Sequence, residues 1–363
     1  MNQRFTKFMC SALCATVFTF VGCNNGEEPT PADSEKKLDH LIFEEICYTG
    51  TWKIWEGAGK LGEQPYKEDQ YLKITNPTEQ TLFLDGLGLL NTYFVTDQLH
   101  ELANGTDFRD THIGTETLLR FPGNVGENRL PIAPGQSVYI ARVAFNHTVD
   151  PTPSSGDGED DNDEGFFMWN KNSYNLSDVD FEWGTKEQIE NDGMFPENPD
   201  VPNMVSVYPP NSEELPYLIP KYGAVALIKI PAEVTNEQLL NDPQYKWDTT
   251  WIDSEKIGRS IPGTRQDPEH EHNSGTIQIL KIPNEWVIDA VQISSQAEYA
   301  WNVVSEKLDK GFTGVYISEA DLKSRPKDYA EKALFRKHDG KKFVDNNNSS
   351  EDFEVRTASK AEK

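Results

Sequence analysis

Short runs of alternating apolar and polar residues, separated by turns rich in Pro, Asn and Gly, constrain the fold of this chain more than any other feature. The run DQYLKIT (Asp69–Thr75) shows this pattern. Residues two apart share one face of a β-strand, so Leu72 and Ile74 would point to one side and Tyr71 to the other. We therefore predict a strand here with one face in a hydrophobic core.

A turn and a return strand follow this first strand. Residues 76–79 (Asn-Pro-Thr-Glu) have the chemistry of a turn, and Thr81–Asp85 forms the return strand before Gly86. The pattern predicts a hairpin-like pair with an apolar face and a solvent-facing one, in which Asp69 and Asp85 serve turns and strand ends. The alternative is that these two aspartates converge on a ligand or a metal. The predicted core residues are Leu72, Ile74, Leu82 and Leu84.

Several more strands and a few short helices are predicted along the chain. Thr235 with Gln238, and Ser318 with Asp321, have the spacing of helix capping boxes. Many short strands with regular turn signals favour a mainly β chain, built as an immunoglobulin-like sandwich with long irregular insertions. The further predicted strands are Leu41–Thr49, Ser137–Phe145, Ala224–Ile230, Thr276–Ile282 and Trp286–Ser294.

Residues 1–22 predict a secretory signal peptide. Arg4 and Lys7 precede an apolar run from Phe8 to Val21. A run of about 14 residues is too short to cross a bilayer as a helix, which needs roughly 20 apolar residues. The segment is therefore interpreted as a signal for export and not as a membrane span.

The end of this segment, Phe20-Val21-Gly22-Cys23, resembles a bacterial lipobox, although Phe20 stands where that motif prefers Leu. The resemblance implies cleavage after Gly22 and a mature chain whose first residue, Cys23, carries the lipid. Two or three acyl chains anchor a protein far more durably than a single chain. The alternative is that Cys23 is an ordinary thiol after a plain signal peptide.

Residues 23–38 are rich in Pro, Glu, Asn and Lys, which is the composition of a flexible tether. Glu27 and Glu28 follow Cys23 at the fourth and fifth positions. This placement resembles the surface-export signal of Bacteroidetes lipoproteins. The resemblance implies a lipid-anchored protein of the outer membrane, displayed at the cell surface. The alternative is that the two glutamates only keep a linker soluble.

The charge of the chain excludes some partners. Sixty acidic residues stand against 34 basic ones, a net charge of −26. Without Arg4 and Lys7 of the signal, 32 basic residues remain and the mature chain has a net charge of −28. Such a surface repels nucleic acid and anionic lipid, so no nucleic-acid partner is predicted. It suits solubility, and it also suits cationic or metal partners.

Only one cysteine belongs to the mature domain. Cys10 and Cys14 lie in the signal peptide and Cys23 is the predicted lipid-attachment residue, so Cys47 has no partner for an intramolecular disulfide. In the alternating run LIFEEICYTG, Cys47 has the position of a small apolar strand residue. The alternative role is that of a nucleophile.

An acidic insertion at about 150–165 has carboxylates at alternate positions, which is a spacing that hard cations can use. An EF-hand loop that began at Asp157 would need Gly at its sixth position and Glu at its twelfth, where this chain has Asn162 and Met168. The motif therefore fails. A block of like charge is typical of a solvated, disordered loop, and calcium binding is the alternative interpretation.

Two imidazoles, His270 and His272, stand on one side of a short extended segment and are a candidate pair of ligands for zinc or copper. Their flanks, Asp267-Pro268 and Asn273-Ser274-Gly275, are typical of a loop, so an ordinary polar loop is the other interpretation. The chain has no Gly-x-Ser-x-Gly, His-Glu-x-x-His, Walker or Gly-x-Gly-x-x-Gly motif. We predict no catalytic residues, no metal and no cofactor, while a carboxylate pair of a glycosidase stays possible.

Two family resemblances bear on the fold. The strand end Ile-Cys-Tyr-Thr-Gly, the segment YKEDQYLKITNPTEQTLFLDGLGLL and the turn LPIAPGQSVYIA are similar to a lamin-tail module, which implies an immunoglobulin-like sandwich. YNLSDVDFEW, NPDVPNMVSVY and VDNNNSSEDFEV resemble an uncharacterised Bacteroidetes outer-membrane lipoprotein family, a domain of unknown function. This second resemblance spans about Leu41–Val355 and implies no activity. We predict a single domain at 39–355 and a disordered tail at 356–363.

Three classes of function fit these features. A non-catalytic binding or assembly component of the outer membrane, accessory to a nutrient-uptake complex, accounts for the anchor, the tether and the missing catalytic motifs. Its expected partners are the membrane, through the lipid anchor, and another outer-membrane protein, with an unknown ligand. The alternatives are a structural envelope protein without a small ligand and an extracytoplasmic hydrolase.

Overall fold

The computed structural model describes residues 38–57, 60–99, 107–149, 169–193, 195–251, 275–315 and 329–361, all within the unit Leu38–Lys363. Several predicted features lie outside these residues. They are the signal peptide, the lipid-attachment residue Cys23, the tether up to residue 37, nearly all of the acidic insertion, the capping box at Ser318, and the pair His270 and His272.

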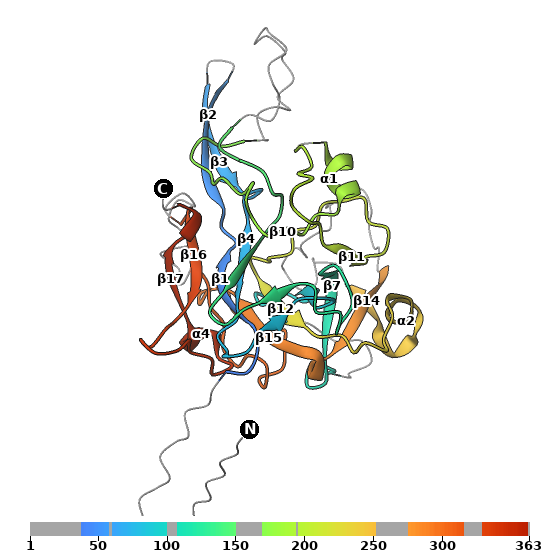
Figure 1. Cartoon of the computed structure of the whole chain (residues 1–363). Helices are drawn as coiled ribbons and strands as arrows, with labels where there is room; N and C mark the ends of the chain where they lie inside the picture. Colours follow the sequence, from blue (N-terminus) through green and yellow to red (C-terminus); the bar gives the residue numbers. More distant parts are fainter. Residues whose placement is uncertain are drawn as a thin grey trace, which may run out of the picture. The chain divides into compact units, whose positions relative to one another are not determined.

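The chain is mainly β, as predicted, and its first large sheet has six strands (Figure 1). Its order is β10-β9-β4-β1-β16-β17, so the last two strands of the chain extend the sheet beside the first one. Only the β10–β9 pair is parallel, and the other pairs are antiparallel. The strands are β1 (Ile42–Cys47), β4 (Tyr71–Thr75), β9 (Ser137–Ala141), β10 (Phe181–Glu182), β16 (Lys332–Arg336) and β17 (Phe353–Thr357).

The second large sheet has seven antiparallel strands in the order β13-β14-β7-β6-β12-β15, and β11 also pairs with β7. These are β6 (Gly88–Thr92), β7 (His112–Arg120), β11 (Val205–Tyr208), β12 (Gly223–Ile228), β13 (Lys246–Trp251), β14 (Gly275–Pro283) and β15 (Val287–Ile293). Two small pairs complete the described strands. They are β2 (Thr51–Gly57) with β3 (Lys60–Tyr66), and β5 (Leu82–Phe83) with β8 (Pro131–Ile132).

The described helices are short. The predicted capping box of Thr235 and Gln238 is confirmed at the start of α2 (Asn236–Asn241). Thr185 and Gln188 form an equivalent box at α1 (Lys186–Asp192), which was not predicted. The other helical elements are α4 (Ser349–Asp352) and the 3-10 turns η3 (Pro243–Tyr245), η4 (Asn284–Trp286) and η6 (Ser359–Ala361).

The main hydrophobic core is shared by the two large sheets. Phe43, Leu72 and Ile74 of the six-stranded sheet belong to one buried cluster with Leu89 and Val225 of the seven-stranded sheet. Burial of such side chains stabilises each by about 1.5 to 3 kcal/mol. The predicted core face of the first strand is therefore confirmed. Leu84 is also buried, whereas Leu82 is only half-buried at the edge of the cluster.

The predicted hairpin is wrong. β4 pairs with β1 and β9, whereas β5 pairs with β8. The turn after β4 is connected to a distant segment, because the Asn76 backbone N–H donates to Gln136 O at 3.0 Å and its side-chain Nδ2 donates to Ile132 O at 2.7 Å. These long-range bonds direct the chain toward β8 instead of back along β4, and no local sequence pattern encodes them.

The face of β4 that was predicted to contact solvent is buried at its start. Tyr71 packs in a second cluster with Cys47 and Tyr174, and its hydroxyl donates to Glu45 Oε1 at 2.5 Å. Cys47 is fully buried at the end of β1, as expected for a small apolar strand residue. Other segments of the chain cover this face. The alternation of apolar and polar residues in β4 does not show whether such a cover exists, so it could not tell this face from one in contact with solvent.

The C-terminal segment differs from the predicted tail at 356–363. β17 continues to Thr357, and the turn η6 follows it. The backbone N–H of Ser359 donates to Glu45 Oε1 at 2.8 Å, and its hydroxyl donates to Glu45 Oε2 at 2.6 Å. Because Glu45 is itself buried, these bonds hold the chain end against β1 through residue 361.

Candidate functional site

A cleft of about 550 Å³ is the candidate functional site. Its walls come from six parts of the described chain: residues 48–52 at the start of β2, residues 65–70 from the end of β3 towards β4, residues 91–95 at the end of β6, Glu116 of β7, residues 217–222 before β12, and Ala330 before β16. This volume lies in the range of pockets that bind small molecules. None of these segments is close to all the others in sequence, so the cleft exists only in the folded chain.

Tyr217 provides an aromatic surface in the cleft. Its ring lies on the Arg142 guanidinium, with Cζ 3.8 Å from the ring centroid. Its hydroxyl donates to Glu68 Oε1 at 3.1 Å, and Glu68 forms an ion pair with Arg142. Arg142 is buried, yet Tyr217 remains 52% exposed. One side of the ring is thus held by a buried cation while much of the side chain stays open to a ligand.

Two buried amides form part of the cleft wall. Gln70 Nε2 donates to Tyr48 O at 2.7 Å, and Asn91 Nδ2 lies 3.2 Å from Glu116 Oε1 and 3.3 Å from Tyr217 O. Within the described residues, Gln70 Oε1 and Asn91 Oδ1 have no hydrogen-bond partner. A buried polar atom without a partner costs about 1 to 3 kcal/mol. Both oxygens are buried, so they belong to the interior of the wall and not to its accessible surface.

The cleft also contains charged side chains. Glu116 is exposed to the cleft, yet the surrounding protein buries its carboxyl enough to raise the pKa to about 7, even though Asn91 donates to it. Lys67 and Lys221 contribute two ammonium groups. Desolvation lowers the pKa of Lys67, and the positive charge of Lys221 lowers this pKa further. The two lysines therefore lie within each other's electrostatic field.

Behind the cleft wall, Asp69 is the centre of a buried polar cluster. Its Oδ2 accepts hydrogen bonds from Thr51 Oγ1 at 2.6 Å and Ser173 Oγ at 2.5 Å, and burial raises its pKa to about 7. Asn170 Nδ2 donates to Thr51 Oγ1 at 2.7 Å. Gly50 has a φ of 63° and lies so close that an added Cβ would meet Asp69 Oδ1 at 2.7 Å. The cluster fixes the backbone where the cleft wall begins.

The structure does not bring Asp69 and Asp85 to a common site. Asp85 accepts hydrogen bonds from the backbone N–H groups of Arg129 at 2.9 Å and Leu130 at 2.8 Å, next to β8. The partners of Asp69 come instead from residues 51 and 173. Asp85 thus connects a strand end to a loop, as predicted, whereas Asp69 is a fully buried side chain.

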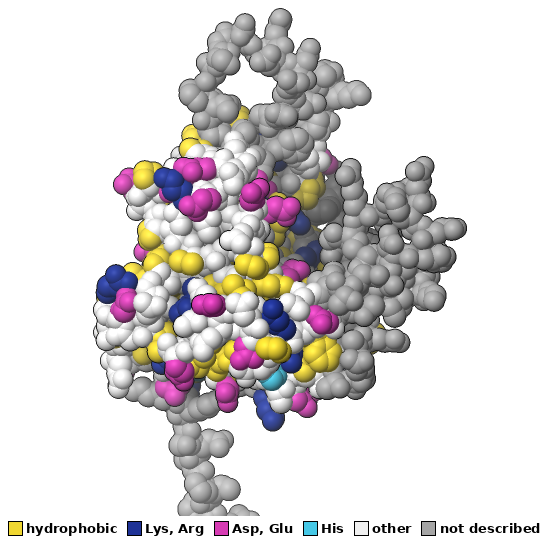
Figure 2. Space-filling model, turned by 90° about the vertical axis from the view of Figure 1, so that its right-hand side faces the viewer, with side chains coloured by type: hydrophobic (Ala, Val, Ile, Leu, Met, Phe, Trp, Pro, Cys, Tyr) yellow, Lys and Arg dark blue, Asp and Glu magenta, His cyan; other side chains and the backbone are white. Residues whose placement is uncertain are grey.

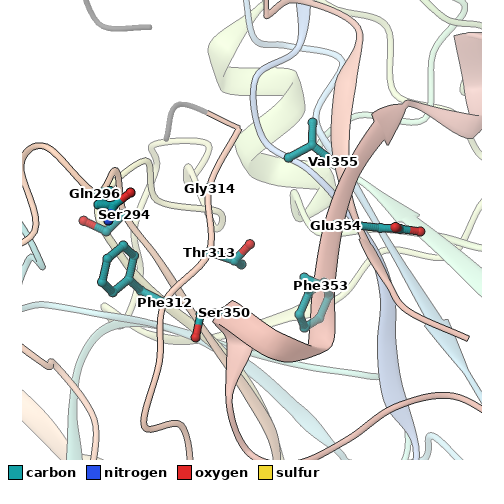
Figure 3. A pocket seen from close by; sticks show the side chains of 9 residues that line it. All are labelled: Ser294, Gln296, Phe312, Thr313, Gly314, Ser350, Phe353, Glu354 and Val355. Atoms are coloured by element: carbon teal, nitrogen blue, oxygen red, sulfur yellow. The ribbon is translucent and has the colours of Figure 1, made fainter. Parts of the chain in front are cut away.

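A second, smaller pocket of about 270 Å³ lies next to β17. Figure 3 shows Phe312 on one side of it and Phe353 on the other, with Thr313 between them. The Phe312 ring stacks on Tyr299 with the centroids 4.1 Å apart. Because this pocket has about half the volume of the cleft and fewer polar side chains, the cleft is the stronger candidate.

In the part of the chain that the structure describes, no three His, Cys, Asp or Glu side chains form a group that could hold a metal ion. No helix of that part is long and apolar enough to span a membrane.

Comparisons with known proteins place this mainly β chain with a small-molecule-sized cleft in one family. Residues 133–360 match the model of DUF4876, described as a protein of unknown function, and the chain belongs to this family. A crystal structure of a DUF4876 family protein from Bacteroides thetaiotaomicron VPI-5482 is similar, with a TM-score of 0.60 and 23% identity over 88% of this chain and 72% of that one. The two proteins share a fold. No curated protein matches.

Proposed function

We propose that this protein is a non-catalytic binding component of the outer membrane whose cleft holds a small hydroxylated ligand such as a sugar ring. The observation that supports this most is Tyr217, which is 52% exposed in the cleft while Arg142 holds it from behind. An aromatic side chain combines a large apolar surface with a polar tip, so it suits a ligand with both apolar and polar groups.

The polar groups of the cleft match a ligand with several hydroxyls. Glu116 and Lys67 line the cleft and are exposed, so a carboxyl group and an ammonium group there can form hydrogen bonds with sugar hydroxyls. The C–H face of a sugar ring is apolar and can lie on an aromatic ring. A purely hydrocarbon ligand would remove these polar groups from water without giving them a hydrogen bond, which disfavours its binding.

The two large sheets are proposed to form an immunoglobulin-like, lamin-tail-like sandwich. Supporting this, one buried cluster takes side chains from β1 and β4 of one sheet and from β6, β12 and β15 of the other. Two sheets that bury a common layer of side chains have the packing of a sandwich. Such a scaffold would hold the segments that line the cleft in fixed positions.

For its location, we propose a lipid anchor at Cys23 and display at the cell surface, with an outer-membrane protein as partner in nutrient uptake. The lipobox-like sequence before Cys23 and the tether that follows it support this proposal. We expect Cys23→Ser to release the protein from membranes, because the acyl chains are lost. Fractionation of cells that express each form tests this. A Cys23→Ser protein that stays with the outer membrane would contradict the anchor.

The cleft is tested by isothermal titration of the full mature protein with neutral and acidic monosaccharides. We expect at least one sugar to bind, and Tyr217→Ala to weaken its affinity about tenfold, or about 1.4 kcal/mol, since the sugar ring loses its aromatic contact surface. Val355→Ala, in the second pocket, serves as the matched control and should leave the affinity unchanged. If no sugar binds, a structural role in the envelope is favoured instead.

A further inference from the structure

β17 is an edge strand of the six-stranded sheet, since it pairs with β16 and with no other strand of the described chain (Figure 1). An edge strand presents backbone N–H and C=O groups to which another chain can bind, and many proteins protect such an edge with a proline or a β-bulge. The five residues of β17 (FEVRT) include no proline, and their pairing with β16 is continuous. The edge therefore lacks both forms of protection.

The register of β17 shows which of its backbone groups face outward. The backbone hydrogen bonds just beyond its two ends are Lys337 N–H to Asp352 O at 2.7 Å and Ala358 N–H to Glu331 O at 2.8 Å. Because bonded and non-bonded pairs alternate along an antiparallel ladder, Glu354 and Arg356 are the residues that bond to β16. The backbone groups of Val355 and Thr357 thus point away from β16.

A second copy of β17, antiparallel to the first and centred on Val355, matches these outward groups. In this arrangement the Val355 N–H of each copy donates to the Val355 C=O of the other, and the Thr357 N–H donates to the Phe353 C=O. The N–H of Phe353 is not needed, because it already donates to Ser349 O at the end of α4. The backbone of the edge can therefore pair with an identical strand.

The charged side chains of β17 are complementary to themselves in this register. Within one chain, Arg356 Nε donates to Glu354 Oε1 at 2.7 Å, and both side chains are exposed. Side chains of both signs also occur over the face in Figure 2, so an exposed pair is ordinary in itself. In the antiparallel pair, however, Glu354 of each copy lies directly opposite Arg356 of the other. A shift by one residue would place two glutamates or two arginines opposite each other, which is destabilising.

Val355 adds an apolar contact on the other face of the strand. Figure 3 shows the side chains of Glu354 and Val355 on opposite sides of β17. Val355 is 36% exposed and lines the pocket of about 270 Å³ that also contains Phe312. In the antiparallel pair the two Val355 side chains lie side by side on the face of this pocket. Contact between two β-branched residues stabilises such a strand pair.

We infer that β17 is an interaction surface for a second copy of this chain, so that two six-stranded sheets join across it into one continuous sheet with two-fold symmetry. The same strand serves on both sides of such an interface, which requires a self-complementary surface. The order Glu354-Val355-Arg356 provides one. A single strand pair buries a small area, so the dimer is weak and its fraction rises with protein concentration.

Sedimentation velocity of the full mature chain tests this, with Cys23→Ser in every form so that no acyl chain drives association. The chain with native β17 should form a dimer as its concentration rises. Glu354→Arg makes both charged positions of the strand positive, and Arg356→Glu makes both negative. Each variant should dimerise about tenfold more weakly, because the pair occurs twice in the dimer and changes from attraction to repulsion. An equimolar mixture of the two variants should form a heterodimer, because opposite charges face each other again.

The control is Lys186→Glu, which reverses an exposed charge on α1, far from β17 in sequence. It should dimerise like the chain with native β17, which separates a local effect from a change in net charge. A chain with native β17 that stays monomeric leaves the edge to a different partner and overturns the inference. Single variants that dimerise undiminished, or a mixture that does not regain association, also overturn it. Association regained in the mixture shows in addition that both variants fold.

Discussion

Replacing Arg336 by Met is expected to lower the free energy of unfolding by about 3 to 5 kcal/mol, because it leaves a buried negative charge without its partner. The Arg336 side chain is 1% exposed, and its Nη2 lies 2.6 Å from Asp289 Oδ2. Its Nε donates to Phe43 O at 2.9 Å, and its Nη1 is 3.4 Å from Asp345 Oδ1. One side chain thus connects β1, β15 and β16.

Urea unfolding of the mature protein measures this loss. Arg356→Met is the matched control, since Arg356 lies on the neighbouring strand β17, its side chain is 52% exposed, and it pairs with Glu354. Exposed ion pairs contribute about 0 to 1 kcal/mol, so this control should change stability little. Adding Asp289→Asn to Arg336→Met should restore part of the loss. Equal effects of the two arginine substitutions would show that the Arg336 network does not stabilise the fold.

Ile74→Ala is expected to lower the free energy of unfolding by about 2 to 5 kcal/mol, because it leaves a cavity in the core shared by the two sheets. Ile74 is 0% exposed and pairs in register with Phe43 of β1 and Val138 of β9, in the middle of the six-stranded sheet. Leu84→Ala should fall in the same range, since Leu84 is buried in the same cluster.

Leu82→Ala is the control for this pair, because Leu82 is half-buried on a two-residue strand. It removes a leucine side chain like that of Leu84, but much of this side chain is in contact with water already. We expect less than half of the loss found for Leu84→Ala in the same urea titration. Comparable losses at Leu82 and Leu84 would mean that the two positions are equally buried in solution.

The sequence predicted strands where a local pattern determines burial. Alternation placed Leu72 and Ile74 correctly, and the spacing of Thr235 and Gln238 identified the start of α2, because both signals arise within a few residues. The box at Thr185 has the same spacing in the segment TKEQ, so this signal was present in the sequence and was not used.

The features that sequence reasoning missed depend on contacts between distant segments. Hydrogen bonds to residues 132 and 136 hold the turn at Asn76. The sequence around this turn therefore could not reveal that the predicted hairpin does not form. The buried Asp69 Oδ2 accepts hydrogen bonds from Ser173 and Thr51, which lie 104 and 18 residues away in sequence. The sequence does not show which polar side chains will have hydrogen-bond partners in the fold, so the burial of Asp69 could not be predicted.

The cleft was missed for the same reason, since its walls come from six separate segments. One weak signal was present: Tyr217 lies between Pro216 and Pro220 in the segment LPYLIPKYG. Each proline fixes the backbone φ angle, so two prolines close together indicate a loop with a rigid backbone. The sequence of this segment does not show that Tyr217 stacks on Arg142, so it does not distinguish Tyr217 from an aromatic residue of the core.

The proposed binding of a sugar-like ligand in the cleft next to Tyr217 is tested most directly by a crystal structure with the tightest-binding monosaccharide. We expect a sugar ring against the exposed side of Tyr217, with its hydroxyls hydrogen-bonded to Glu116 or Lys67. A sugar found only in the pocket between Phe312 and Phe353, with the cleft at Tyr217 holding none, would contradict it.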